Sequence, residues 1–199
     1  MSKRTKCALR CLSCRMHIGR CLCESIPRLE LDTKLALIMH RREHKKPTAT
    51  GPLAAKALMH SNIYIHGEKE TPLDLSHLNN KTRRPLLLFP SERARLLSDD
   101  LVKEDPRPIT LIVPDGNWRQ AKRMPKRIPG LEKIEHVILP EGSQTEWGIR
   151  QETKENGLAT FEAISRAFGI IESKAAENEL MTVFRLMVRN TLEASGKLS

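Results

Sequence analysis

The stretch Ile109-Thr-Leu-Ile-Val-Pro-Asp115-Gly-Asn-Trp118-Arg-Gln-Ala-Lys-Arg-Met124 decides the fold. It opens with a short aliphatic run, which is typical of a buried strand. Turn-forming residues come next, and the part from Asn117 to Met124 has the composition of a helix that Pro125 closes. A strand, a turn and a helix in this order predict an α/β sheet with Asp115 at the mouth beyond a strand.

Four more aliphatic runs, each bounded by polar residues, Pro or Gly, have the same character. They are Lys34–Met39, Asn62–Ile65, Pro85–Phe89 and Ile134–Leu139. Helices are expected at Pro52–His60, Glu92–Leu97, Ala159–Phe168 and Ala175–Leu192. The last two repeat apolar residues every three or four positions, so we expect them to cover the sheet. The alternation predicts one α/β domain over residues 31–199, preceded by a small N-terminal segment, residues 1–30.

Composition narrows the class of protein and its partners. The chain has 199 residues, 39% hydrophobic content and no apolar run of eighteen or more residues, so no membrane span is expected. Its formal charge of +10 is an electrostatic signature of proteins that bind polyanions, with RNA or DNA first and acidic proteins or the ribosome as alternatives. Aromatic residues make up only 4%, which favours backbone contacts with one or two inserted bases over a broad stacking platform.

Four cysteines near the N-terminus, Cys11-x-x-Cys14-x(6)-Cys21-x-Cys23, have the spacing of a zinc site. Four thiolates complete a tetrahedron and leave no position for a catalytic water, so the predicted zinc is structural. Cys7 is the spare cysteine, and a set that pairs it with Cys11 is the weaker alternative. Disulfides are a further alternative, but residues 1–20 contain no apolar run typical of a secretory signal. A reducing, cytoplasmic location is therefore expected.

Polar and turn-forming residues follow four of the predicted strands. The segments are His40-Arg-Arg-Glu43, Pro90-Ser-Glu-Arg93, Asp115-Gly-Asn-Trp118 and Pro140-Glu-Gly142. Ligands of parallel α/β sheets bind in the crevice beyond the carboxyl ends of the strands, where such loops meet. The sequence therefore predicts a binding site built from these four loops.

The helix after Asp115 carries the predicted chemistry. Arg119, Lys122 and Arg123 share one helical face, which suggests a phosphate-binding surface beside a carboxylate. Each feature also has an ordinary explanation. Asp115 would suit a turn or a helix cap, Trp118 would suit a core position at the sheet edge in place of base stacking, and the three basic residues would suit a solvated face.

Four motifs in order resemble the DTW-domain family. They are the cysteine arrangement, Leu88-Phe89-Pro90-Ser91 with Ala94, the segment Asp115–Met124, and Leu158-Ala-Thr-Phe-Glu162-Ala163. Two positions depart from the family pattern: Asn117 stands where the family has Thr, and Ala49 replaces an amide in Thr48-Ala-Thr-Gly51. The family resembles the SPOUT methyltransferases and ribosomal RNA aminocarboxypropyltransferases, so the resemblance implies a mostly parallel SPOUT-like sheet with a C-terminal knot.

The resemblance also implies a function. Family members are tRNA-uridine aminocarboxypropyltransferases, which move the 3-amino-3-carboxypropyl group of S-adenosylmethionine to N3 of a tRNA uridine and release methylthioadenosine. By this resemblance the catalytic residues are Asp115 and Trp118, and the cofactor-binding residues are Phe89, Pro90, Leu139, Thr160 and Glu162. The expected RNA-binding residues are His40, Arg41, Arg42, Lys45, Arg119, Lys122, Arg123 and Arg150.

The implied reaction suits these residue types. Uracil N3 is a weakly acidic imide, so a carboxylate within hydrogen-bond reach is able to take its proton as N3 attacks the carbon beside the sulfonium. Asp115 is the candidate base. Two alternatives remain open at this point: an RNA methyltransferase that uses the same S-adenosylmethionine, and a zinc-stabilised RNA-binding protein without catalytic activity.

Overall fold

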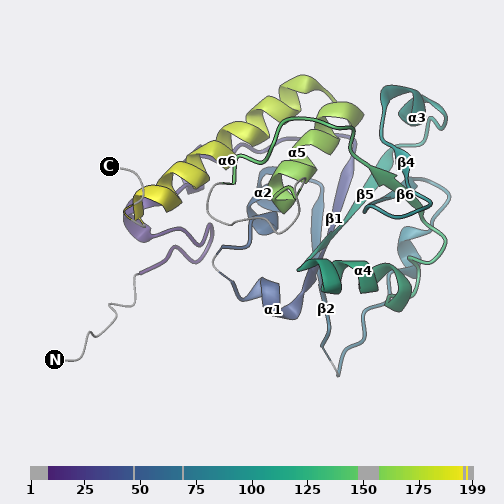
Figure 1. The fold of residues 1–199 in the computed structure, drawn as a ribbon, viewed down its shortest axis with the longest axis horizontal. Coiled ribbons are helices and arrows are strands. Elements are labelled where there is room, and N and C mark those ends of the chain that lie inside the picture. Colours follow the sequence, from purple (N-terminus) through teal and green to yellow (C-terminus); the bar gives the residue numbers. More distant parts are fainter. Residues whose placement is uncertain (1–8, 47, 69, 148–156, 195, 197–199) are drawn as a thin grey trace.

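The computed structural model describes residues 9–46, 48–68, 70–147, 157–194 and 196. Its centre is a six-stranded sheet in which every strand pairs parallel to its neighbours (Figure 1). The strands are β1 (Lys34–His40), β2 (Ser61–His66), β3 (Arg84–Leu88), β4 (Arg95–Leu96), β5 (Ile109–Asp115) and β6 (Glu135–Ile138), in the order β2-β1-β5-β3-β6-β4. The predicted mostly parallel α/β sheet is confirmed, and the C-terminal knot stays a prediction.

Helices cover both faces of this sheet. They are α1 (Arg41–His44), α2 (Gly51–Ala57), α3 (Asp99–Lys103), α4 (Trp118–Arg127), α5 (Thr160–Ile171) and α6 (Lys174–Ala194), with short 3-10 turns at Ile18–Arg20, Cys23–Ser25 and Ser76–Leu78. No helix in the described part of the chain is long and apolar enough to cross a membrane.

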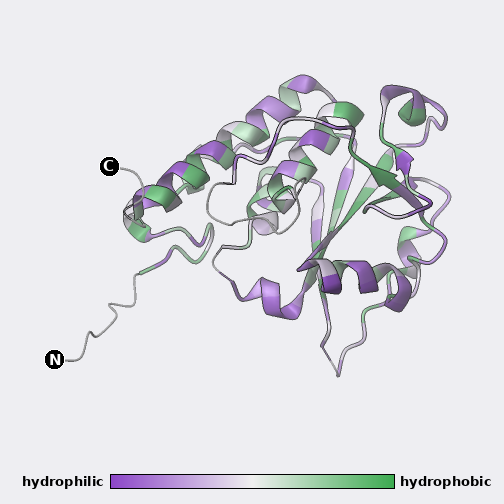
Figure 2. Ribbon diagram, in the orientation of Figure 1, coloured by the Kyte–Doolittle hydropathy of each residue, from purple (hydrophilic) through white to green (hydrophobic). Residues whose placement is uncertain are grey.

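Alternate residues of each central strand enter two different core clusters. In β5, Leu111 and Val113 pack with α2, α5 and α6, whereas Ile112 points to the opposite face and packs with Met124 of α4. Apolar strands therefore lie between layers of helices, and the outer surface of α4 is mostly hydrophilic (Figure 2). Burial on both faces explains why the strands read as continuous aliphatic runs instead of alternating ones.

The predicted strands at all five aliphatic runs are confirmed, and so are α5 and α6 to within a few residues. Two helices, α1 and α3, were not predicted. The helix α2 ends at Ala57, short of His60. The helix α4 continues past Pro125 to Arg127, because this Pro lies in the last turn and the amide N of Ile128 still donates to the carbonyl of Met124 at 3.0 Å.

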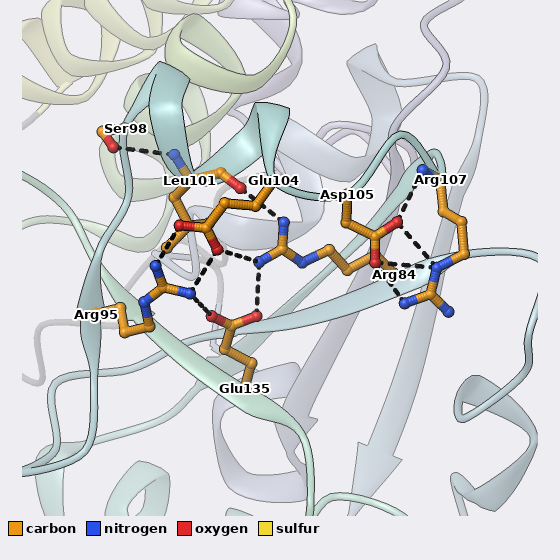
Figure 3. Close-up of polar contacts among 8 residues, drawn as sticks. All are labelled: Arg84, Arg95, Ser98, Leu101, Glu104, Asp105, Arg107 and Glu135. Carbon is orange, nitrogen blue, oxygen red and sulfur yellow. Dashed lines mark hydrogen bonds and ion pairs between the residues drawn. The ribbon is translucent and has the colours of Figure 1, made fainter.

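The helix predicted at Glu92–Leu97 is wrong, because this segment contains the edge strand β4. Leu97 is fully buried, and its amide N donates to the carbonyl of Ile138 next to β6. Arg95 forms ion pairs with Glu104 at 2.5 Å and with Glu135 at 2.9 Å (Figure 3). Arg84, a buried guanidinium, also pairs with Glu135 at 2.8 Å. This network ties a two-residue strand to β3, β6 and α3, so tertiary contacts override the local helical preference.

Candidate active site and metal centre

A cavity of about 820 Å³ lies at the carboxyl ends of β3, β5 and β6. The loops after these three strands line it, together with the connection between α1 and α2 and the start of α5. Because β5, β3 and β6 are neighbours in the sheet, their loops meet at one edge. Four of the predicted cofactor residues line this cavity: Phe89, Pro90, Leu139 and Thr160.

Asp115 ends β5 and forms part of the cavity wall, with only 8% of its surface exposed. Thr160 at the start of α5 donates a hydrogen bond of 2.8 Å from Oγ1 to Asp115 Oδ1. Gly51 lies against the other carboxylate oxygen, since a Cβ atom at this glycine would be 2.9 Å from Oδ2. The close approach of Gly51 and the hydroxyl of Thr160 therefore fix where the carboxylate lies.

The N-cap of α4 is Asn117 and not Asp115. Asn117 Oδ1 accepts from the backbone N of Gln120 at 3.0 Å, and the Gln120 side chain accepts from the backbone N of Asn117 at 2.8 Å. This reciprocal pair satisfies two amide groups at the helix start. The capping explanation for Asp115 is therefore wrong. It also explains why Asn is accepted where the resemblance expects Thr, since both are good N-cap residues.

Trp118 lies at the first turn of α4 and lines the cavity. Its side chain is 39% exposed, and its ring centroid is 6.0 Å from that of Phe89. The alternative of an ordinary core position is therefore wrong: this indole presents an aromatic surface at the cavity, three residues after Asp115.

Three successive residues at the start of α5 hold the end of β5 and two loops. Besides the contact from Thr160, the backbone N of Phe161 donates to Thr50 Oγ1 at 3.2 Å. Glu162 is fully buried, and its carboxylate accepts hydrogen bonds from Thr145 Oγ1 and from the backbone N of Glu146 and Ala159, at 2.5, 2.7 and 2.9 Å. Glu162 does not line the cavity. Its contacts hold the loop after β6, which lines the cavity, so Glu162 has a structural place, and its direct contact with the cofactor stays a prediction.

The basic residues expected to bind RNA lie on two adjacent helices. Arg42 and Lys45 at α1 are exposed and Arg41 is half-buried, while Arg119, Lys122 and Arg123 are exposed on α4. Arg150 lies outside the described residues. Two further basic residues of α4 that were not predicted, Lys126 and Arg127, are also exposed and extend the same basic face.

His40 joins these two helices. Its Nδ1 accepts a hydrogen bond from the backbone N of Arg42, which caps α1, and lies 3.1 Å from Gln120 Nε2 of α4. Burial lowers the pKa of His40, and the nearby Arg42 and Arg41 lower it further. His40 therefore connects α1 to α4 through contacts that suit a neutral imidazole, and its contact with RNA stays a prediction.

The four predicted cysteines form one cluster. The Sγ atoms of Cys11 and Cys23 are 3.6 Å apart, those of Cys14 and Cys21 are 3.7 Å apart, and all four lie within 4.8 Å of one another. Zn–S bonds of about 2.3 Å in a tetrahedron separate the sulfur atoms by about 3.8 Å, so the cluster has the dimensions of a four-thiolate metal site. Cys7 lies outside the described residues.

Backbone amides donate hydrogen bonds to sulfur atoms of this cluster. The amide N–H groups of Cys14 and Ser13, followed by the thiols of Cys21 and Cys23, lower the pKa of the Cys11 thiol to about 6. The pKa of Cys21 is raised to about 12, because the neighbouring thiols outweigh the backbone N–H of Cys23, which lowers it. The backbone N of Leu22 donates to Cys14 Sγ at 3.5 Å. Donors directed at sulfur stabilise the thiolate form that metals require.

The cysteine-bearing segment packs on the main domain. Met16 and Leu22 are buried in the core cluster that contains α5 and α6. Arg15 has a φ of +62°, a backbone region that favours glycine, and its guanidinium donates to the carbonyl of His44 at the end of α1. Asn190 of α6 donates to the carbonyl of Arg20 at 3.3 Å. Two points of attachment therefore fix this segment relative to α1 and α6.

An all-parallel α/β sheet, a cavity at its carboxyl edge and a cluster of four cysteines define a class: an α/β protein with a candidate ligand site beyond its strand ends and an N-terminal cysteine cluster that has the dimensions of a metal site. The DTW domain matches residues 8–192, which is nearly the whole chain. The chain belongs to the DTW-domain family.

Relatives with established names are similar over most of this chain. A tRNA-uridine aminocarboxypropyltransferase 2 of Drosophila melanogaster is 24% identical over 83% of this chain and 67% of its own length. Proteins of the same name from Macaca fascicularis and Mus musculus are 28% and 25% identical over 81% and 86% of this chain. This chain spans 56% and 59% of their lengths.

A solved structure of the SAM-dependent rRNA:acp-transferase Tsr3 from Vulcanisaeta distributa aligns with a TM-score of 0.45 and 19% sequence identity. The alignment covers 86% of this chain and 80% of that one.

Proposed function

We propose that this protein is a tRNA-uridine aminocarboxypropyltransferase, which transfers the 3-amino-3-carboxypropyl group of S-adenosylmethionine to N3 of a tRNA uridine. The observation that carries the proposal is the place of Asp115, a buried carboxylate held by Thr160 in the wall of a cavity large enough for a nucleoside cofactor. The relatives named tRNA-uridine aminocarboxypropyltransferase support the same reaction.

In the proposed reaction, N3 of the uracil attacks the chain carbon bonded to the sulfonium. An N–C bond forms, the C–S bond breaks with its electrons going to sulfur, and methylthioadenosine leaves. Asp115 accepts the N3 proton, so the positive charge lost at the sulfonium appears as the proton on the carboxylate. Trp118 offers an aromatic face beside this carboxylate on which the uracil ring stacks.

The proposed cofactor site uses the loops after Phe89, Val113 and Leu139, with Thr160 at the start of α5. Peptide groups of these loops supply donors and acceptors for the adenine. Thr160 and Glu162 act by position: one orients Asp115, and the other holds the loop that follows β6.

The proposed tRNA contact is the basic face of α1 and α4. It contains Arg41, Arg42, Lys45, Arg119, Lys122 and Arg123. Gln120 Nε2 of α4 donates to His40 Nδ1, which keeps α1 and α4 side by side, so the two helices offer phosphates one surface next to the cavity.

The proposed metal is a structural zinc ion held by Cys11, Cys14, Cys21 and Cys23. Four sulfur ligands suit zinc, and the bound ion would stabilise a segment too short to build its own core. A reducing compartment such as the cytoplasm keeps the four thiols available for it.

The by-product of the reaction tests the proposal. Purified protein is incubated with S-adenosylmethionine and unmodified tRNA, and the released nucleoside is identified by chromatography and mass spectrometry. Methylthioadenosine with a modified uridine is expected. Adenosylhomocysteine with a methylated base would identify a methyltransferase instead, and tight tRNA binding without any modified nucleoside would identify a non-catalytic RNA-binding protein.

A further inference from the structure

A pair of oppositely charged side chains also lines the cavity, apart from Asp115. Glu43 and Lys46 lie after β1, and Glu43 Oε1 is 2.6 Å from Lys46 Nζ. The Glu43 side chain is only 9% exposed, whereas that of Lys46 is 46% exposed. Buried carboxylates in proteins are usually paired, and Lys46 is the partner of Glu43 here, so the cavity wall carries one negative and one positive group side by side. We propose that this pair is the subsite for the amino-acid end of S-adenosylmethionine, an inference that rests on the function proposed above.

The chemistry of the two side chains matches that end of the cofactor. An amino-acid group carries an ammonium and a carboxylate on one carbon. Glu43 accepts hydrogen bonds from the ammonium, and Lys46 donates to the carboxylate, so each charge meets its opposite in a site partly shielded from water. An uncharged wall would leave both charges of the ligand without partners, which is costly in a cavity.

The strand order gives the direction in which the cofactor lies. Glu43 follows β1, Asp115 ends β5, Phe89 follows β3 and Leu139 follows β6, and these strands are successive neighbours in the sheet. Neighbouring strands are about 4.8 Å apart, so the three steps from β1 to β6 span roughly 14 Å. An extended cofactor then has its adenine near Leu139 and its amino acid near Glu43.

This direction bears on which carbon is transferred. With the amino acid at the β1 side and the adenine at the β6 side, the chain between sulfur and the amino acid runs past β5 and lies next to Asp115. The carboxylate that takes the N3 proton is then beside the carbon chain. The subsite therefore orients the cofactor for transfer of the longer group.

Arg166 is the competing partner for the cofactor carboxylate. It lines the same cavity on the far side, where its guanidinium donates to the carbonyl of Ser143 in the loop after β6. A cofactor lying in the reverse direction would place its amino acid there. A variant of Arg166 is therefore the matched control for variants of Glu43 and Lys46.

Two ligands that differ in the amino-acid end test the subsite. S-adenosylhomocysteine and methylthioadenosine are both uncharged at sulfur, but only the former carries the amino acid. Calorimetric titration of each ligand is made with the wild-type chain and with Glu43→Gln, Lys46→Met and Arg166→Gln. For Glu43→Gln and Lys46→Met we expect the affinity for adenosylhomocysteine to fall about tenfold or more, with methylthioadenosine affinity within about twofold of wild type.

Each other outcome overturns the subsite. Equal losses for both ligands would make the pair a structural element of the cavity, and no loss for either would make it an ordinary surface ion pair. A loss specific to adenosylhomocysteine in Arg166→Gln alone would reverse the direction of the cofactor. A wild-type protein that binds neither ligand would overturn the proposed function itself, which is a separate result. Lys46→Met leaves the buried Glu43 carboxylate without its partner, so urea unfolding of both variants is measured beside the titrations to show that the fold is kept.

Discussion

Thr160 and Asp115 are joined by a hydrogen bond of 2.8 Å, from the hydroxyl at the start of α5 to Oδ1 at the end of β5. The bond connects a helix that covers the sheet to the strand that carries the candidate base. A carboxylate held at one oxygen keeps a fixed orientation, and general-base catalysis requires the base within hydrogen-bond reach of the proton. Thr160 is therefore a positioning residue in the proposed reaction.

The first prediction concerns this hydroxyl. Thr160→Val should lower the single-turnover rate by about tenfold or more, since a hydrogen bond to a charged group contributes about 1.5–3 kcal/mol. Thr160→Ser keeps the hydroxyl and should retain most of the rate. Single-turnover assays and cofactor titrations on both variants check this. Weaker cofactor binding by Thr160→Val at an unchanged rate would instead indicate direct contact with the cofactor.

The second prediction concerns the base itself. Asp115→Asn should keep cofactor and tRNA binding but lower the rate of the chemical step by about 10²–10⁴-fold, since the amide keeps the shape and loses the proton affinity. Because Asn117 is the cap of α4, Asp115→Asn leaves the helix start intact. A single-turnover rate within about threefold of wild type would reject Asp115 as the base.

Asn117→Ala is the matched control for this second prediction. Loss of the cap should lower the free energy of unfolding by about 1 kcal/mol, measured in urea, while the chemical step changes far less than in Asp115→Asn.

Much of the fold was predictable because the central strands are buried on both faces and therefore consist of aliphatic runs. The segment Ile109–Val113 is an example, with all its residues buried. The edge strand β4 has no such pattern. Arg95 pairs with Glu135, which lies forty positions away in the chain, and this contact helps to hold Arg95 and Leu96 in an extended strand. A contact between such distant positions cannot be predicted from the local sequence.

The site shows the same division between local and distant information. Asp115 could be predicted because it follows a predicted strand, and the four cysteines because their spacing is typical of a metal site. The role of Glu162 could not be predicted, because the sequence does not distinguish a buried structural carboxylate from one that binds a cofactor. Only the fold shows that Glu162 accepts from Thr145 and Glu146 instead of facing the cavity.

The third prediction concerns the metal. Cys21→Ser should lose the bound zinc and unfold the cysteine-bearing segment, since structural zinc contributes about 10–16 kcal/mol in small zinc-finger peptides. The α/β sheet should survive, although Met16 and Leu22 would no longer pack in its core cluster. Elemental analysis measures the zinc, and amide hydrogen exchange reports on residues 9–25. Stoichiometric zinc with unchanged exchange would contradict the assignment. Cys7→Ser is the control and should keep one zinc ion per chain.

The fourth prediction concerns tRNA binding. Replacing Arg119, Lys122 and Arg123 by Ala should flatten the slope of log affinity against log salt by roughly two to three units, since each neutralised phosphate contributes about 0.7–0.9. Binding is measured by filter retention over a series of salt concentrations. An unchanged slope would assign the three residues to a solvated face.

A control for tRNA binding comes from the opposite end of the sheet. Lys81, Lys103 and Lys133 are exposed near the amino ends of β3, β5 and β6. A triple alanine variant there removes the same charge and should leave the slope close to that of the wild-type chain.

The fifth prediction concerns His136, a buried residue of β6. Arg93 lies 2.7 Å from its Nε2, and Ser91 Oγ lies 2.8 Å from its Nδ1. An arginine only donates, so Nε2 accepts and Nδ1 carries the proton that is donated to Ser91. Ser91 follows Pro90 of the cavity wall, so the neutral imidazole holds this loop. Burial lowers the pKa of His136 below its ordinary 6.5, and the positive charge of Arg93 lowers it further.

The lowered pKa of His136 predicts loss of stability on acidification. As the pH falls through 6.5, the unfolded chain binds a proton at this histidine before the folded chain does, so the free energy of unfolding decreases until the folded pKa is passed. Urea unfolding at pH 7.5 and 5.5 should give a lower midpoint at pH 5.5. His136→Gln should remove part of this difference, because His40 and His66 also have lowered pKa values. His60→Gln, at an exposed position, is the control and should preserve the difference. An identical pH dependence in His136→Gln and wild type would show that the Ser91–His136–Arg93 contacts do not depend on a neutral imidazole.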